Sequence, residues 1–230
     1  MGEIWSWWHS LLLATTITLR VALGALALGL VWGLLGATAK SSSSRALRRL
    51  ADAYTTINRG VPELLIILIT YYGGTVILTQ ALRLFNPEMR YVEIPAIAAG
   101  IFSLSLVFGA YATEAFRGAM LAIPAGQIEA AMAVGMPRWL IFRRVKLPQL
   151  WRFALPGLGN NWISLVKDTS LVSTVGLDDI MRVSKLAANV THLHFQFMAC
   201  AALIYLTLTF VNTAALERLE RRANRGGRRE

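Results

Sequence analysis

Four consecutive polar residues interrupt an apolar stretch in the second half of the chain: Lys167, Asp168, Thr169 and Ser170. A charge at the centre of a bilayer costs at least about 2.5–3.5 kcal/mol, so it needs a structural or functional reason. The ammonium, the carboxylate and the hydroxyls offer donors and acceptors that could line a polar path. Lys167 and Asp168 could instead form an ion pair that holds an irregular backbone in place, and both interpretations stay open.

Motifs of covalent catalysis and metal binding are missing from the sequence. It contains no Gly-x-x-x-x-Gly-Lys-Ser/Thr phosphate loop, no Gly-x-Ser-x-Gly elbow and no His-Glu-x-x-His pair. His192 and His194 are two positions apart, whereas two ligands on one helical face are three or four apart. The single Cys200 excludes an intrachain disulfide. We therefore expect no catalytic residue, no metal and no cofactor in this chain.

The composition places the chain in a membrane. Of its 230 residues, 55% are hydrophobic and 16% are charged, and the mean hydropathy is +0.51, whereas soluble domains carry about 25% charged residues. At about 20 apolar residues per spanning helix, we predict an all-α membrane protein with a single transmembrane domain over residues 1–230. About five spans are expected, at 11–39, 61–84, 94–116, 151–175 and 195–216.

Two of these spans have unusual features. The first is too long for the bilayer core, which predicts tilt or protrusion. The fourth contains Pro156, Gly157, Gly159, Asn160 and Asn161 before the four polar residues. It is therefore expected to be partly broken or irregular, which membranes tolerate only where the backbone is buried in protein or lines a cavity.

Basic residues indicate the orientation. Seventeen of the 23 Lys and Arg residues fall within 40–59, 117–152 and 218–229, and four fall on the other side of the predicted spans. Since basic residues collect on the cytoplasmic side, we expect the amino terminus outside and the carboxyl terminus in the cytoplasm. Residues 45–54 are expected to lie on the cytoplasmic surface as a basic amphipathic segment. The basic run at 218–229 is typical of contact with anionic lipid rather than nucleic acid.

The longest predicted cytoplasmic loop, 117–150, has the signals of a rigid elbow. Pro124 and Ala125 open a first short helix, and Gly135 follows it where a left-handed residue is needed. Pro137 opens a second helix, which Pro148 is expected to end. Near this loop, Glu63 and Glu114 are expected to lie on a solvated or salt-bridged face, and Arg59 or Arg117 could be their partners.

This loop resembles the cytoplasmic EAA loop of ABC importer permeases. The resemblance rests on Glu129, Ala130, Ala131, Gly135, Val145, Leu147 and Pro148, with Val145 in place of the usual isoleucine. It implies a type I importer permease fold, in which a coupling helix at 127–135 inserts into a groove of an ATPase subunit. The residues expected to couple to the ATPase are Gln127, Glu129, Ala130, Ala131, Gly135, Leu147 and Pro148.

Further segments narrow the resemblance. Permeases for polar amino acids, of the histidine, lysine, arginine, ornithine and opine group, are similar at residues 59–62, at Tyr111, Glu114, Phe116, Arg117 and Gly118, and at residues 167–171. The resemblance implies ATP-driven import of a basic amino acid or opine-like solute across the bacterial inner membrane, with Lys167, Asp168, Thr169 and Ser170 on the solute path or gate. The implied partners are an ATP-binding-cassette ATPase dimer that binds ATP and Mg²⁺, a second permease subunit, identical or paralogous, and an external solute-binding protein.

The sequence also bears on two other function classes, a self-sufficient transporter and an intramembrane enzyme. Arg20, Lys167 and Asp168 lie within predicted spans, as they would in a self-sufficient channel or an ion-coupled carrier. Uptake by the purified chain alone would favour that alternative. An intramembrane enzyme finds no support in the motifs.

Overall fold

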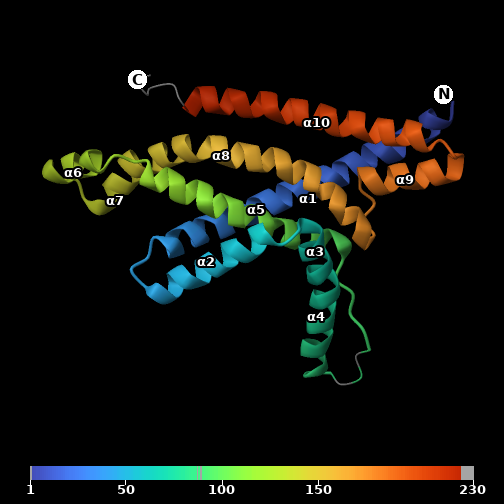
Figure 1. Cartoon of the computed structure of the whole chain (residues 1–230), viewed down its shortest axis with the longest axis horizontal. Coiled ribbons are helices and arrows are strands. Elements are labelled where there is room, and N and C mark those ends of the chain that lie inside the picture. Colours follow the sequence, from blue (N-terminus) through green and yellow to red (C-terminus); the bar gives the residue numbers. More distant parts are fainter. Residues whose placement is uncertain (1, 87, 89, 224–230) are drawn as a thin grey trace.

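The chain folds into helices joined by short connections (Figure 1). The computed structural model describes residues 2–86, 88 and 90–223, and every regular element within them is helical, which confirms the predicted all-α class. The elements are α1 (Gly2–Lys40), α2 (Arg45–Gly60), α3 (Glu63–Leu68), η1 (Ile69–Gly73), α4 (Gly74–Arg83), α5 (Ala96–Leu121), α6 (Ala125–Ala133), α7 (Arg138–Ile141), η2 (Phe142–Lys146), α8 (Leu147–Asp168), η3 (Thr169–Val175), α9 (Ile180–Thr191) and α10 (His194–Ala223).

Four helices in the described ranges are long and apolar enough to cross a membrane: Ile4–Lys40, Glu63–Arg83, Ala96–Leu121 and His194–Ala223. Each overlaps a predicted span, and the second combines α3, η1 and α4 into one continuous helix. The 39 residues of α1 extend over about 58 Å at 1.5 Å per residue. Since the hydrocarbon core is about 30 Å thick, α1 must tilt or protrude, as its sequence predicted.

The fourth predicted span, 151–175, corresponds to α8 and η3. α8 continues without a break through Pro156 to Asp168, and the 3₁₀ helix η3 follows it. The expected irregular backbone therefore begins at Thr169 rather than at Pro156. α8 is not among the four helices above, and it carries Gln149, Arg152 and two asparagines. It nevertheless lies within the bundle, packed against α5 and α10.

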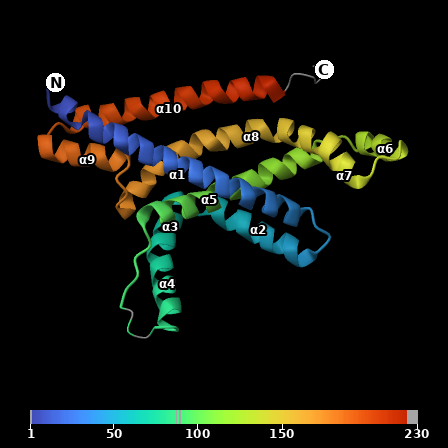
Figure 2. The same ribbon diagram turned by 180° about the vertical axis from the view of Figure 1, so that it is seen from behind.

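α1 and α5 form the most extensively packed pair of helices, and they cross at the centre of the molecule (Figure 2). Small residues line the crossing, as at other close contacts between membrane helices. A Cβ added at Gly33 would lie 2.6 Å from the Cβ of Ala112, and one added at Gly36 would lie 2.2 Å from Thr113 Oγ1. The glycines therefore set how closely the two helices approach.

α2 packs against α1 and α5, with Ala51 and Thr55 buried. The predicted basic amphipathic segment 45–54 is thus the first part of a longer helix that reaches Gly60. Val61 and Pro62 are extended and separate α2 from α3. The α3–η1–α4 helix then projects away from the bundle (Figures 1 and 2).

Candidate functional site

The predicted elbow forms at one end of the bundle (Figure 1). α6 begins directly after Pro124, and Gly135 follows its end with φ +78°. The Gly135 N–H donates to the Met132 carbonyl at 3.0 Å, and the Met136 N–H donates to the Ala131 carbonyl at 3.1 Å. These are the two hydrogen bonds of a Schellman motif. The left-handed glycine expected from the sequence is therefore confirmed.

The prediction that Pro148 ends the second short helix is wrong. α7, η2 and α8 follow one another without a break, and Pro148 lies in the first turn of α8. Inside a helix a proline has no N–H to donate, and its ring crowds the carbonyl four residues back. Here the π-helical turn of η2 directly precedes Pro148, and such a turn departs from the regular α-helical hydrogen bonding that a proline would break. The second arm of the elbow therefore continues directly into the bundle.

Most residues of the expected coupling set lie at the surface of this elbow. Gln127, Glu129, Ala130, Gly135 and Pro148 are exposed, Leu147 is half-buried and Ala131 is buried. The Nε2 atom of Gln149 donates to Oε1 of Gln127 at 2.7 Å and so joins α6 to α8. Large apolar side chains beside the set are also exposed, namely Leu121, Met132, Val134 and Trp139. An exposed apolar surface on a braced, protruding elbow is typical of a protein-binding site.

A cavity of about 260 Å³ lies between α3, α5 and α8. Two carboxylates line it, Glu63 from α3 and Asp168 from the end of α8. Its other lining residues are Leu104, Val107, Phe108, Tyr111, Asn161, Ser164 and Leu165. No lysine or arginine is among these residues, so the charged groups of the lining are both negative. In the part of the chain that the structure describes, no three His, Cys, Asp or Glu side chains come together as metal ligands.

Of the four polar residues at 167–170, the structure brings Asp168 into this cavity. Lys167 is exposed, and on a regular helix it points about 100° away from Asp168. The two side chains form no ion pair, because the ion pairs between described residues lie elsewhere. Thr169 is buried and donates to the Val166 carbonyl at 2.7 Å, and Ser170 is half-buried in η3.

Sequence reasoning missed several residues of this cavity. Asn161, Ser164 and Asp168 repeat at three and then four positions along α8, which places them on one helical face. In a regular α8, this spacing predicts that the three side chains point to the same side. The approach of Glu63 and Tyr111 to the same cavity had no local signal, since α3 and α5 are distant from α8 in the sequence.

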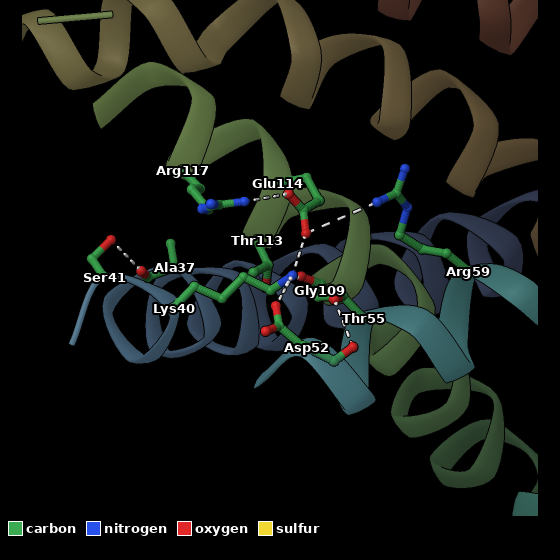
Figure 3. A network of polar contacts seen from close by, with 10 residues as sticks. All are labelled: Ala37, Lys40, Ser41, Asp52, Thr55, Arg59, Gly109, Thr113, Glu114 and Arg117. Atoms are coloured by element: carbon green, nitrogen blue, oxygen red, sulfur yellow. Dashed lines mark hydrogen bonds and ion pairs between the residues drawn. The ribbon is translucent and has the colours of Figure 1, made fainter. Parts of the chain in front are cut away.

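Next to the cavity, charged side chains join α1, α2 and α5 into an ionic network (Figure 3). Lys40 Nζ lies 2.6 Å from Oε1 of Glu114 and 2.9 Å from Oδ1 of Asp52. Glu114 also lies 3.9 Å from Arg59 Nη1 and 3.8 Å from Arg117 Nη1. The expected pairing of Glu114 with Arg59 or Arg117 is thus confirmed for both arginines.

A partly buried hydroxyl holds α2 against the middle of α5. Tyr54 donates to the Leu106 carbonyl at 2.8 Å. Burial raises the pKa of Tyr54 above its ordinary value, so the hydroxyl keeps the proton that it donates. The ionic network and this hydrogen bond therefore fix α2, and with it Arg59, relative to α5.

Residues 25–225 match the protein family described as binding-protein-dependent transport system inner membrane component. The chain is 47% identical to the nopaline transport system permease protein of Agrobacterium fabrum, over 96% of this chain and 94% of that protein. It is 40% identical to the histidine/lysine/arginine/ornithine transport system permease protein of Escherichia coli, over 93% of this chain and 92% of that protein.

Solved structures share the fold over nearly the whole chain. A crystal structure of an amino acid ABC transporter with histidines matches with a TM-score of 0.80 and 30% identity, covering 95% of this chain and 96% of that one. An inward-facing MetNI methionine ABC transporter matches with a TM-score of 0.67 and 19% identity, over 97% and 98% of the two chains.

Proposed function

The chain belongs to the family of binding-protein-dependent transport system inner membrane components, and from this premise we propose that its cavity carries a cationic amino acid or an opine across the inner membrane. It is a permease subunit of an ABC importer, and ATP hydrolysis takes place on a separate subunit. The resemblance, the type I fold and the transport function expected from the sequence are thereby confirmed.

The two carboxylates in the cavity carry the proposal of a cationic solute. Glu63 and Asp168 face the same space, and no lining residue among those described brings a compensating positive charge. Two like charges that share a confined site disfavour each other's ionisation, and a cation placed between them removes that cost. The name of the histidine/lysine/arginine/ornithine relative supports such a solute.

The exposed elbow supports the proposed ATPase contact. α6 presents Gln127, Glu129 and Ala130 on its surface, while the hydrogen bond between Gln149 and Gln127 ties it to α8. A movement imposed on α6 would therefore be passed to α8, whose far end carries Asp168. We propose that a dimer of ATPases, which holds ATP and Mg²⁺, docks on this elbow from the cytoplasm.

The remaining partners and the orientation follow from the same reasoning. The family description includes a binding protein, and we propose an external solute-binding protein and a second permease subunit as members of the complex. The basic residues of 40–59, 117–152 and 218–229 support a cytoplasmic elbow and carboxyl terminus, with the amino terminus outside.

Charge selectivity of uptake tests the proposed function. The complex that co-purifies with the tagged chain is reconstituted, and ATP-dependent uptake of arginine and glutamine is measured. Asp168→Asn should lower arginine uptake by at least about tenfold and glutamine uptake much less. Lys167→Gln removes a charge next to Asp168 but outside the cavity lining, and it should leave the ratio of the two rates unchanged.

Two results would contradict the proposal. Equal losses for arginine and glutamine in the Asp168→Asn variant would assign the carboxylate a structural role. Arginine uptake by the chain alone, with no ATPase present, would support a self-sufficient channel or ion-coupled carrier instead.

A further inference from the structure

Arg59 lies behind one wall of the cavity. Its guanidinium carbon is 5.3 Å from the centre of the Tyr111 ring, and that ring lines the cavity. The Arg59 side chain comes from the end of α2 and is 45% exposed. A positive group is thus held next to a cavity whose own charged residues, Glu63 and Asp168, are negative.

The present partners of Arg59 hold it weakly. Its Nη1 lies 3.9 Å from Oε1 of Glu114, which is too long for a hydrogen bond. The same oxygen already accepts from Lys40 at 2.6 Å. Contact with an aromatic face is a weak interaction at an exposed site. The guanidinium can therefore move away from Glu114, because that carboxylate stays paired with Lys40.

Among the residues that the structure describes, the lining of the cavity offers no positive group to the carboxylate of a cationic amino acid. A cationic amino acid carries an α-ammonium, a positive side chain and a carboxylate. Glu63 and Asp168 complement the two positive groups. We propose that Arg59 binds the solute carboxylate, because a guanidinium matches a carboxylate in two parallel hydrogen bonds. This inference rests on the proposed transport of a cationic amino acid.

The backbone between Arg59 and Glu63 allows both residues to reach one solute. Val61 (φ −103°, ψ 137°) and Pro62 (φ −55°, ψ 135°) are extended and separate α2 from α3. A Cβ added at Gly60 would meet no atom within 4 Å, so this connection has free space around it. A solute held by its carboxylate on Arg59 and by an ammonium on Glu63 would therefore fix the angle between the two helices.

Binding of arginine and agmatine to the permease–ATPase complex tests this role. The complex is placed in lipid nanodiscs without a solute-binding protein, and both dissociation constants are measured. Agmatine keeps the guanidinium of arginine but lacks the carboxylate. Arg59→Gln should weaken arginine binding by at least about tenfold and leave agmatine binding unchanged, and Arg59→Lys should restore part of the arginine affinity.

Arg117→Gln is the matched control, since Arg117 contacts the same Glu114 at 3.8 Å but is absent from the cavity lining and from the contacts of the Tyr111 ring. It should leave the ratio of the two dissociation constants unchanged. Equal weakening of arginine and agmatine by Arg59→Gln would overturn the inference and leave the proposed function intact. If the wild-type complex bound neither probe, the proposed cavity and the role of Arg59 would both be wrong.

Discussion

Lys40 Nζ lies 2.6 Å from Oε1 of Glu114, although 74 positions separate the two residues (Figure 3). The Lys40 side chain is 7% exposed, whereas its second partner, Asp52, is 62% exposed. An ammonium that has lost most of its hydration depends strongly on its counter-charge. The pair therefore fixes the end of α1 to the part of α5 that leads into the elbow.

Glu114→Gln should lower the free energy of unfolding by about 1.5–3 kcal/mol, because it leaves a nearly buried ammonium with one solvated partner. Asp52→Asn should cost less than about 1 kcal/mol, since solvent already screens that carboxylate. Thermal unfolding of the detergent-solubilised variants measures both changes. Similar losses in the two variants would show that Lys40 does not depend on Glu114 in particular.

The sequence predicted the partners of Glu114 only in part. Arg59 and Arg117 were expected because they lie near the same predicted cytoplasmic ends, but Lys40 was not. The approach of Lys40 to Glu114 depends on how closely α1 and α5 pack, which the glycines of α1 determine. Such a contact depends on the angle at which two helices cross and on how each is rotated about its axis. The pattern of neighbouring residues in the sequence specifies neither.

The elbow shows the same contrast between local and long-range signals. The roles predicted for Pro124, Gly135 and Pro137 are correct, because each residue restricts or permits only the backbone conformation of its own turn. The prediction that Pro148 ends a helix is wrong, since a π-helical turn directly before it continues into α8. Asp168 was predicted for the solute path or gate, but its companion Glu63 became apparent only from the cavity that both residues line.

Gly36→Ala should separate α1 from α5. The added methyl group would lie 2.2 Å from Thr113 Oγ1, and overpacking of this kind costs about 1–3 kcal/mol. Gly73→Ala is the control, because its nearest atom, Ile69 Cγ2, lies 3.9 Å away. It should change stability by less than about 1 kcal/mol. The melting temperatures of the two variants measure these changes. An equal decrease in both would exclude a special role for the Gly36 contact.

Gly135→Val should impair coupling without impairing membrane insertion. A side chain at φ +78° costs about 1–2 kcal/mol, which reduces the population of the bent elbow roughly tenfold. Gly135→Asn is the matched variant, because asparagine tolerates left-handed backbone. Solute-stimulated ATP hydrolysis by the reconstituted complex should fall in the valine variant and largely persist in the asparagine variant. Full stimulation in both would argue against a conformational role for this glycine.

Asp179 is a buried carboxylate outside the membrane-spanning helices. It caps α9, where Oδ1 accepts from the Arg182 N–H at 2.8 Å, and it is 0% exposed. Its other oxygen, Oδ2, has no hydrogen-bond partner among the described residues. Burial raises the pKa of Asp179 from 3.8 to about 6, against the opposing effect of the Arg182 N–H.

Asp179→Asn should change how stability depends on pH. Between pH 3.8 and about 6, the folded protein retains a proton that the unfolded chain releases, so this residue lowers the free energy of unfolding as the pH rises, by up to about 3 kcal/mol. The asparagine keeps an oxygen for the α9 cap and cannot ionise. The melting temperature of the variant, relative to the wild type, should therefore increase from pH 4.5 to pH 7.

Asp178→Asn, at the neighbouring carboxylate that is 65% exposed, should show no such trend. Parallel curves for Asp179→Asn and the wild type would mean that Asp179 stays ionised in the folded protein.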